Sequence, residues 1–164
     1  MYKIVLISLF VGVFLNIEAQ TINYASIQKE IISTFPDINF SNKLLVVSIW
    51  NSADITSREM NKEINRTYEM YKGAKFTNGL NGIIYISISS DTNEMQYSIC
   101  MKKDLNAYQY TICDFKSFLQ NSKLFNMDLN PSIKNLTFNT NGLLIYQNLA
   151  TNQIVKSFSA LLTR

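Results

Sequence analysis

The chain has 164 residues, of which 47% are hydrophobic and 16% are charged, and its formal net charge is +3 at pH 7. These values favour one globular domain and argue against a disordered chain. Histidine is absent, which removes the commonest metal ligand and the commonest general base near neutral pH. No basic block exceeds the pair Lys102–Lys103 and no glycine-rich phosphate loop occurs, so we expect no nucleic acid, metal or bound cofactor.

The N-terminus has the pattern of a secretory signal peptide. One lysine precedes an apolar run over residues 4–15, and Ala19 then stands as a small residue at a cleavage position. The run is short for a membrane span, and the alternative is an uncleaved N-terminal anchor. We therefore predict a signal peptide over residues 1–19 and one domain over 20–164. The mature protein is expected in the periplasm or outside the cell, with no stable membrane span after cleavage.

The first half of the mature chain predicts two helices around a buried strand. Apolar residues at helical spacing predict a helix over residues 22–35, which a proline ends. The run Leu44–Trp50 is apolar at nearly every position, so it predicts a central strand that is covered on both faces. A polar turn follows, and we expect a long helix over Ser57–Lys72 with Asp54 or Thr56 as its N-cap.

The second half predicts more strands than helices. Residues 83–88 are nearly all β-branched or aromatic, which favours a second strand, and Asp91 or Thr92 is expected to cap a helix running to about Leu105. The later elements are a short strand over 108–113, a weak helix over 116–127, two strands over 133–139 and 143–148, and an amphipathic helix over 154–162. The Asn-Gly pair at 141–142 indicates a hairpin between the last two strands.

Strands that are separated by helices indicate right-handed parallel connections, and the hairpin adds an antiparallel edge. The expected fold is therefore an α/β sandwich of three layers, α/β/α. It has a mixed central sheet and ends in a C-terminal β-hairpin plus helix.

The run over residues 50–61 reads Trp-Asn-Ser-Ala-Asp-Ile-Thr-Ser-Arg-Glu-Met-Asn and follows directly on the apolar strand. It resembles the Trp-Ala-Ser-Trp-Cys-x-x-Cys-Arg-x-Glu-Met-Pro motif of exported TlpA-like thiol–disulfide oxidoreductases and their peroxiredoxin-like relatives. The residues that fit in place are Trp50, Ser52, Arg58, Glu59 and Met60. The strand ending in Asp91 and the hairpin over 136–142 also fit this family. The resemblance covers about residues 36–162 and implies a thioredoxin-like fold.

The resemblance also shows what is missing. The two family cysteines fall on Asp54 and Ser57, and neither side chain can carry out thiol–disulfide exchange. The family's cis-proline falls on Ile133, where a cis bond would cost about 3 kcal/mol, so we expect a trans bond. The resemblance therefore implies a non-catalytic binding or accessory module for an extended peptide or protein in the cell envelope. Asp54, Ser57 and Ile133 would mark its contact surface, and no catalytic residue is assigned.

Other interpretations stay open at this stage. Asp54 and Ser57 sit at a helix N-terminus, so plain helix capping explains them as well. The two cysteines, Cys100 and Cys113, are an even number in an exported chain, which favours a disulfide, but they also suit two separate buried thiols. A third interpretation is a thiol–disulfide oxidoreductase that uses Cys100 and Cys113, and a fourth is a structural subunit of an envelope complex.

Overall fold

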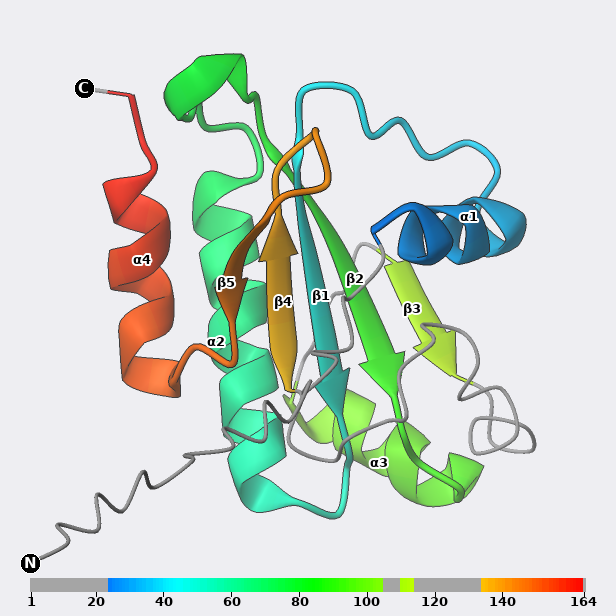
Figure 1. Cartoon of the computed structure of the whole chain (residues 1–164). Helices are drawn as coiled ribbons and strands as arrows, with labels where there is room; N and C mark the ends of the chain where they lie inside the picture. Colours follow the sequence, from blue (N-terminus) through cyan, green and yellow to red (C-terminus); the bar gives the residue numbers. More distant parts are fainter. Residues whose placement is uncertain (1–23, 105–109, 114–133, 164) are drawn as a thin grey trace, which may run out of the picture.

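The computed structural model describes residues 24–104, 110–113 and 134–163. The helices and strands in chain order are α1 Tyr24–Thr34, β1 Leu44–Trp50, α2 Ile55–Tyr71, β2 Ile83–Ser89, α3 Glu94–Asp104, β3 Tyr110–Cys113, β4 Asn135–Phe138, β5 Leu144–Gln147 and α4 Ile154–Ala160 (Figure 1). This order confirms the predicted sequence of elements within the described ranges. The predicted signal peptide over 1–19, the helix over 116–127 and Ile133 lie outside the described residues.

The five strands form one mixed sheet in the order β3-β2-β1-β4-β5. Strand β2 runs parallel to β1 and to β3, whereas β4 is antiparallel to both β1 and β5. All seven residues of β1 are buried, as the continuous apolar run predicts for a strand covered on both faces. The mixed sheet and the C-terminal hairpin are therefore confirmed.

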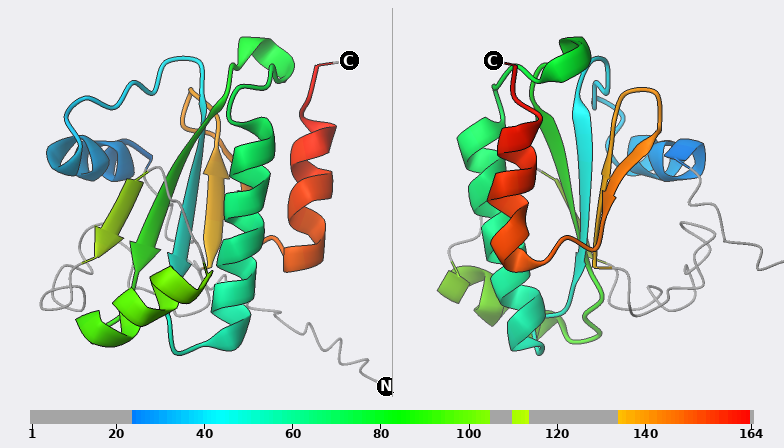
Figure 2. Two further views of the ribbon diagram at one scale, coloured as in Figure 1. Left: turned by 180° about the vertical axis from the view of Figure 1, so that it is seen from behind. Right: turned by 60° about the vertical axis from the view of Figure 1, so that its left-hand side comes forward.

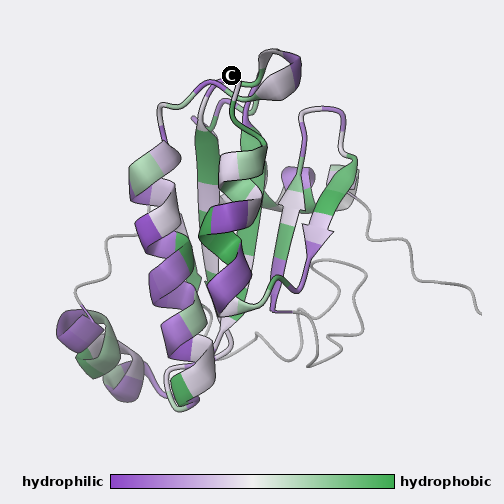
Figure 3. Cartoon of the chain, turned by 90° about the vertical axis from the view of Figure 1, so that its left-hand side faces the viewer, coloured by the Kyte–Doolittle hydropathy of each residue, from purple (hydrophilic) through white to green (hydrophobic). Residues whose placement is uncertain are grey.

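Helices cover both faces of this sheet and complete the three layers. Alternate residues of β1 point to opposite faces: Leu45 and Val47 belong to the core under α1, and Leu44 and Val46 belong to the core under α2 and α4. Figure 2 shows α1 on one side of the sheet with α2 and α4 on the other. Figure 3 shows hydrophilic residues on the outer surfaces of α2 and α4 and hydrophobic strands behind them. Helix α3 lies beyond the carboxyl ends of β1 and β2.

The predicted Asn-Gly hairpin joins β4 to β5. The Asn139 side-chain oxygen accepts from the backbone N–H groups of Asn141 and Leu143 at 2.9 Å each, and Gly142 has φ +76°. A Cβ atom at residue 142 would lie 2.6 Å from the Tyr24 ring. Only glycine therefore suits this turn, because α1 packs directly against it.

The starts of two helices, α2 and α3, decide which residue caps each helix. Asp54 is the N-cap of α2, and the helix begins at Ile55 rather than Ser57. The prediction that Asp91 or Thr92 caps α3 is wrong, because the Asn93 side-chain oxygen accepts from the backbone N–H of Gln96 at 3.0 Å. Asp91 is buried instead, and its hydrogen bonds belong to the site described next.

Candidate functional site

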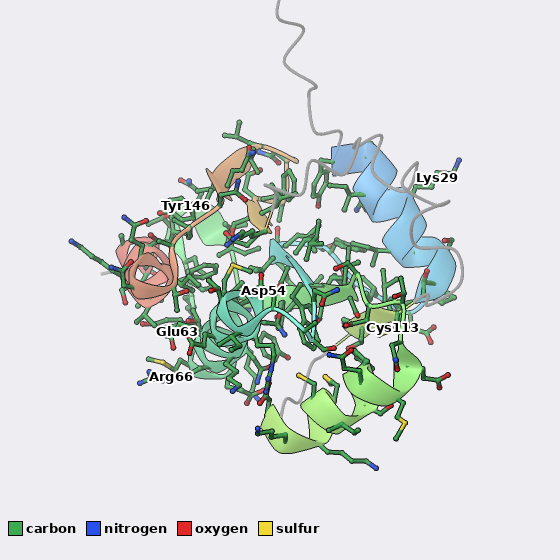
Figure 4. The ribbon with its side chains drawn as sticks, turned by 90° about the horizontal axis from the view of Figure 1, so that it is seen from below. Lys29, Asp54, Glu63, Arg66, Cys113 and Tyr146 are labelled. Atoms are coloured by element: carbon green, nitrogen blue, oxygen red, sulfur yellow. The ribbon has the colours of Figure 1, made fainter. Side chains whose placement is uncertain are left out.

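The loop over residues 51–54, here called the β1–α2 loop, leaves the carboxyl end of β1 and leads into α2. Asp54 is exposed at its end (Figure 4), and its carboxylate accepts from the backbone N–H of Thr56 at 3.0 Å. Ser57 is buried, and its Oγ accepts from the backbone N–H of Asn51 at 3.0 Å. Both predicted site residues therefore hold the loop and the helix start. Only Asp54 is also open to contact from solvent.

Asp91 fixes this loop to the end of β2. Asp91 is 3% exposed, and its carboxylate accepts from the Ser52 backbone N–H at 3.0 and 3.2 Å and from the Ser52 hydroxyl at 2.5 Å. The Ser89 hydroxyl donates to its other oxygen at 2.6 Å. In the sequence Asp91 matches the end of the family's strand, but this role in holding the loop was not predicted. The sequence feature that could have indicated this role is Ser52 in the loop together with a strand that ends in Ser-Ser-Asp.

A neutral polar network lies in the core below the loop. Ser48 pairs with Ser87 across β1 and β2, and both are fully buried. The Ser48 and Tyr85 hydroxyls donate to the Asn61 side-chain oxygen at 2.8 and 2.7 Å, and the Trp50 indole N–H donates to Ser87 at 2.8 Å. Burial raises the pKa of Tyr85, so its phenol stays protonated. This network gives the loop rigid support and contributes no group that exchanges protons near neutral pH.

The two cysteines are free thiols in this structure, so the predicted disulfide is not formed there. Cys100 is buried on α3 and donates to the Asp104 carboxylate at 3.3 Å. Burial, helped by Asp104, raises the pKa of Cys100 to about 11. Cys113 is half-buried at the end of β3, where it shares a hydrogen bond with Tyr97, and burial raises its pKa as well. Both thiols therefore stay protonated near neutral pH, whereas a nucleophilic cysteine needs a lowered pKa.

Arg58, one of the residues that match the motif, joins α2 to α3. Its guanidinium donates to both oxygens of Asp104, at 2.6 and 2.9 Å, and Lys62 adds a contact of 2.9 Å. The hydrogen bond from Arg58 holds the pKa of Asp104 well below its usual range. We call Arg58, Lys62, Cys100 and Asp104 the Asp104 cluster.

One small cavity lies among the described residues. The best-defined cavity among them has a volume of about 10 Å³ and lies between α2, α4 and the sheet, away from the β1–α2 loop. It is apolar and holds at most one water molecule. Within the described residues, no group of three or more potential metal-ligating side chains lies close together, and no helix is long and apolar enough to cross a bilayer.

The sheet order, the helix on each face and the loop at the carboxyl end of β1 define a thioredoxin-like fold. No known family model matches the chain, and no curated protein is similar to it in sequence.

Solved structures resemble it clearly. The thioredoxin domain of a thiol-disulfide oxidoreductase from Bacteroides vulgatus has a TM-score of 0.59 at 13% identity, over 76% of this chain and 82% of that one. A thioredoxin-like protein from Parabacteroides distasonis has a TM-score of 0.58 at 19% identity, over 75% and 87%. A thiol-disulfide oxidoreductase from Bacteroides fragilis has a TM-score of 0.54 at 20% identity, over 73% and 81%. These likenesses confirm the predicted thioredoxin-like fold.

Proposed function

We propose that this protein is an exported thioredoxin-fold module that binds an extended peptide or a protein of the cell envelope and does not catalyse thiol–disulfide exchange. The observation that carries the proposal is the chemistry of the two positions that match the family cysteines. Asp54 caps α2 and Ser57 accepts a backbone hydrogen bond. Without sulfur at the loop, no mixed disulfide with a substrate can form there.

The exposed part of the loop supports a binding role. Ala53, Asp54 and Thr56 are exposed, and the Ile55 side chain is 70% exposed next to them. Because Asp91 already fixes the loop, little conformational entropy is lost when a partner binds. Ser57 contributes by holding the loop rather than by contact. Ile133 remains part of the proposed surface on the strength of the resemblance alone.

Export rests on the signal-peptide pattern of residues 1–19. The mature protein should accumulate in the periplasmic or extracellular fraction. Its mass should correspond to cleavage after Ala19. A full-length chain retained in the cytoplasm would contradict this part of the proposal.

An insulin-reduction assay with dithiothreitol tests the absence of redox catalysis. The wild type should not accelerate the reaction, whereas a double variant with Asp54→Cys and Ser57→Cys should gain activity because it restores the motif on an intact loop. Turnover by the wild type that is abolished by Cys100→Ser or Cys113→Ser would overturn the proposal. That result would favour an oxidoreductase with relocated cysteines.

Site-specific photo-crosslinking in the intact cell envelope tests the binding surface. A crosslinking residue at position 55 should capture a discrete partner, and Asp54→Ala should reduce the yield. Position 70 is a matched control, because Met70 is also exposed, at 52%, on the other end of α2. Equal crosslinking from both positions, or a yield unaffected by Asp54→Ala, would show that this loop is not the contact surface.

A further inference from the structure

Helix α3 is held to the rest of the described structure by few contacts. It buries one of its eleven residues, Cys100, whereas α2 buries five of its seventeen. Its apolar side chains Met95 and Ile99 are 73% and 56% exposed. The ordinary means of fixing a helix, an apolar stripe against the core, is therefore nearly absent from α3.

Three side chains of α3 make contacts with other described elements. Tyr97, Cys100 and Asp104 are spaced by three and four residues, which places them on one side of the helix. The Tyr97 ring packs against Trp50 with 5.7 Å between centroids. Asp104 binds Arg58 and Lys62 of α2, and Cys100 donates to Asp104. Ion pairs therefore contribute to this attachment together with the ring contact of Tyr97.

The energetics of this attachment differ from those of the core. The Asp104 side chain is 2% exposed, but those of Arg58 and Lys62 are 19% and 45% exposed. When the helix detaches, water can solvate the exposed cations and so offset much of the ion-pair energy that is lost. The apolar cores under α1 and α2 have no such compensation, because exposure of apolar side chains to water is unfavourable.

The charged residues of α3 are placed favourably at its two ends. Glu94 lies in its first turn, and Lys102 and Lys103 lie in its last turn. This arrangement favours the helix dipole at both ends. An isolated helix of eleven residues is still only marginally stable in water, so release would leave its backbone amides open to exchange with solvent.

We propose that α3 detaches from the domain as a unit while the sheet, α2 and α4 stay folded, and that the charge on Asp104 sets how often it detaches. Detachment uncovers the Trp50 ring, which directly precedes the β1–α2 loop, and exposes the Cys100 thiol. It therefore adds apolar surface next to the loop for a short time. This inference concerns the fold and holds whether or not the loop binds a partner.

Hydrogen exchange measured by mass spectrometry on the full mature chain tests the inference. In Asp104→Asn, the amides of α3 should exchange at least about tenfold faster than in the wild type, because the two cations lose their shared carboxylate. In the wild type the amides of α3 should already exchange faster than those of α2 and β1, which need global unfolding to exchange. Glu69→Gln is the matched control, since it removes the carboxylate of the exposed pair Lys72–Glu69 and should leave α3 unaffected.

Two outcomes would overturn it. One is that the amides of α3 exchange in the wild type at the same rate as those of α2 and β1. The other is an exchange rate of α3 that does not change in Asp104→Asn, which would mean that the Asp104 cluster does not hold the helix. If Asp104→Asn does not fold, Lys62→Ala removes the more exposed contact and should give a smaller increase in the exchange rate of α3.

Alkylation of Cys100 in the wild type provides an independent measurement. If the thiol reacts through local release, its rate should change little at low urea, because little surface is exposed. A rate that rises with urea as steeply as global unfolding would contradict detachment of α3 as a unit.

Discussion

Replacement of Asp91 by alanine should destabilise the domain by about 3 kcal/mol. Three donors lose their acceptor: the Ser52 backbone N–H, the Ser52 hydroxyl and the Ser89 hydroxyl. A buried donor left without a partner costs about 1–3 kcal/mol. We use the low end because the hydroxyls can rotate and because removal of a buried carboxylate also removes its desolvation cost. The melting temperature should fall by about 6–12 °C.

Urea unfolding at pH 7 measures this loss, with fluorescence of the single tryptophan of the chain as the probe. Asp54→Ala is the comparison, because loss of an exposed N-cap costs about 1 kcal/mol. Asp91→Asn keeps one acceptor oxygen and should lie between Asp91→Ala and the wild type. If Asp91→Ala loses no more stability than Asp54→Ala, the carboxylate does not hold the loop and the reasoning fails.

Three further predictions concern stability and thiol chemistry. The folded-state pKa of Asp104 lies below its ordinary value of 3.8, so the ionised carboxylate stabilises the fold above about pH 4 and this stabilisation is lost as pH falls. In urea titrations, the difference in unfolding free energy between wild type and Asp104→Asn should therefore shrink below pH 4. Gly79 and Gly142 both have φ +76°, but only at residue 142 would a Cβ atom clash, so thermal unfolding should show a loss of about 1 kcal/mol for Gly79→Ala and about 3 kcal/mol for Gly142→Ala. Iodoacetamide at pH 8 should label Cys100 and Cys113 slowly in the folded protein and both rapidly in urea without reductant, whereas a disulfide would leave them unlabelled.

The arrangement of the sheet could be predicted because its signals are local. The apolar run at Leu44–Trp50 matches β1 residue for residue, and the Asn-Gly pair fixes the hairpin. Helix ends differ by one or two residues, as at the start of α2, where Ile55 joins the helix because Asp54 satisfies the N–H of Thr56. Patterns of this kind depend on neighbours along the chain and need no knowledge of distant contacts.

The site could not be predicted in the same way, because its partners are far apart in sequence. Asp91 before a helix has the pattern of an N-cap, and only Ser52, which precedes it by 39 residues, makes it the anchor of the loop instead. The pairing of Arg58 with Asp104 spans 46 residues. The raised pKa of Cys100 likewise has burial as its main cause, and burial depends on contacts that the sequence does not reveal.

The contact between Tyr24 and the turn at Gly142 has a consequence for the order of assembly. The first described helix completes its packing only when the last hairpin has formed, since Tyr24 also meets Phe138 with 5.4 Å between ring centroids. A chain that emerges N-terminus first therefore exposes the apolar residues Ile27 and Ile31 until nearly all of it is available. Contacts of such long sequence separation slow folding. The nascent protein should remain unfolded, and open to chaperones, until late in its synthesis.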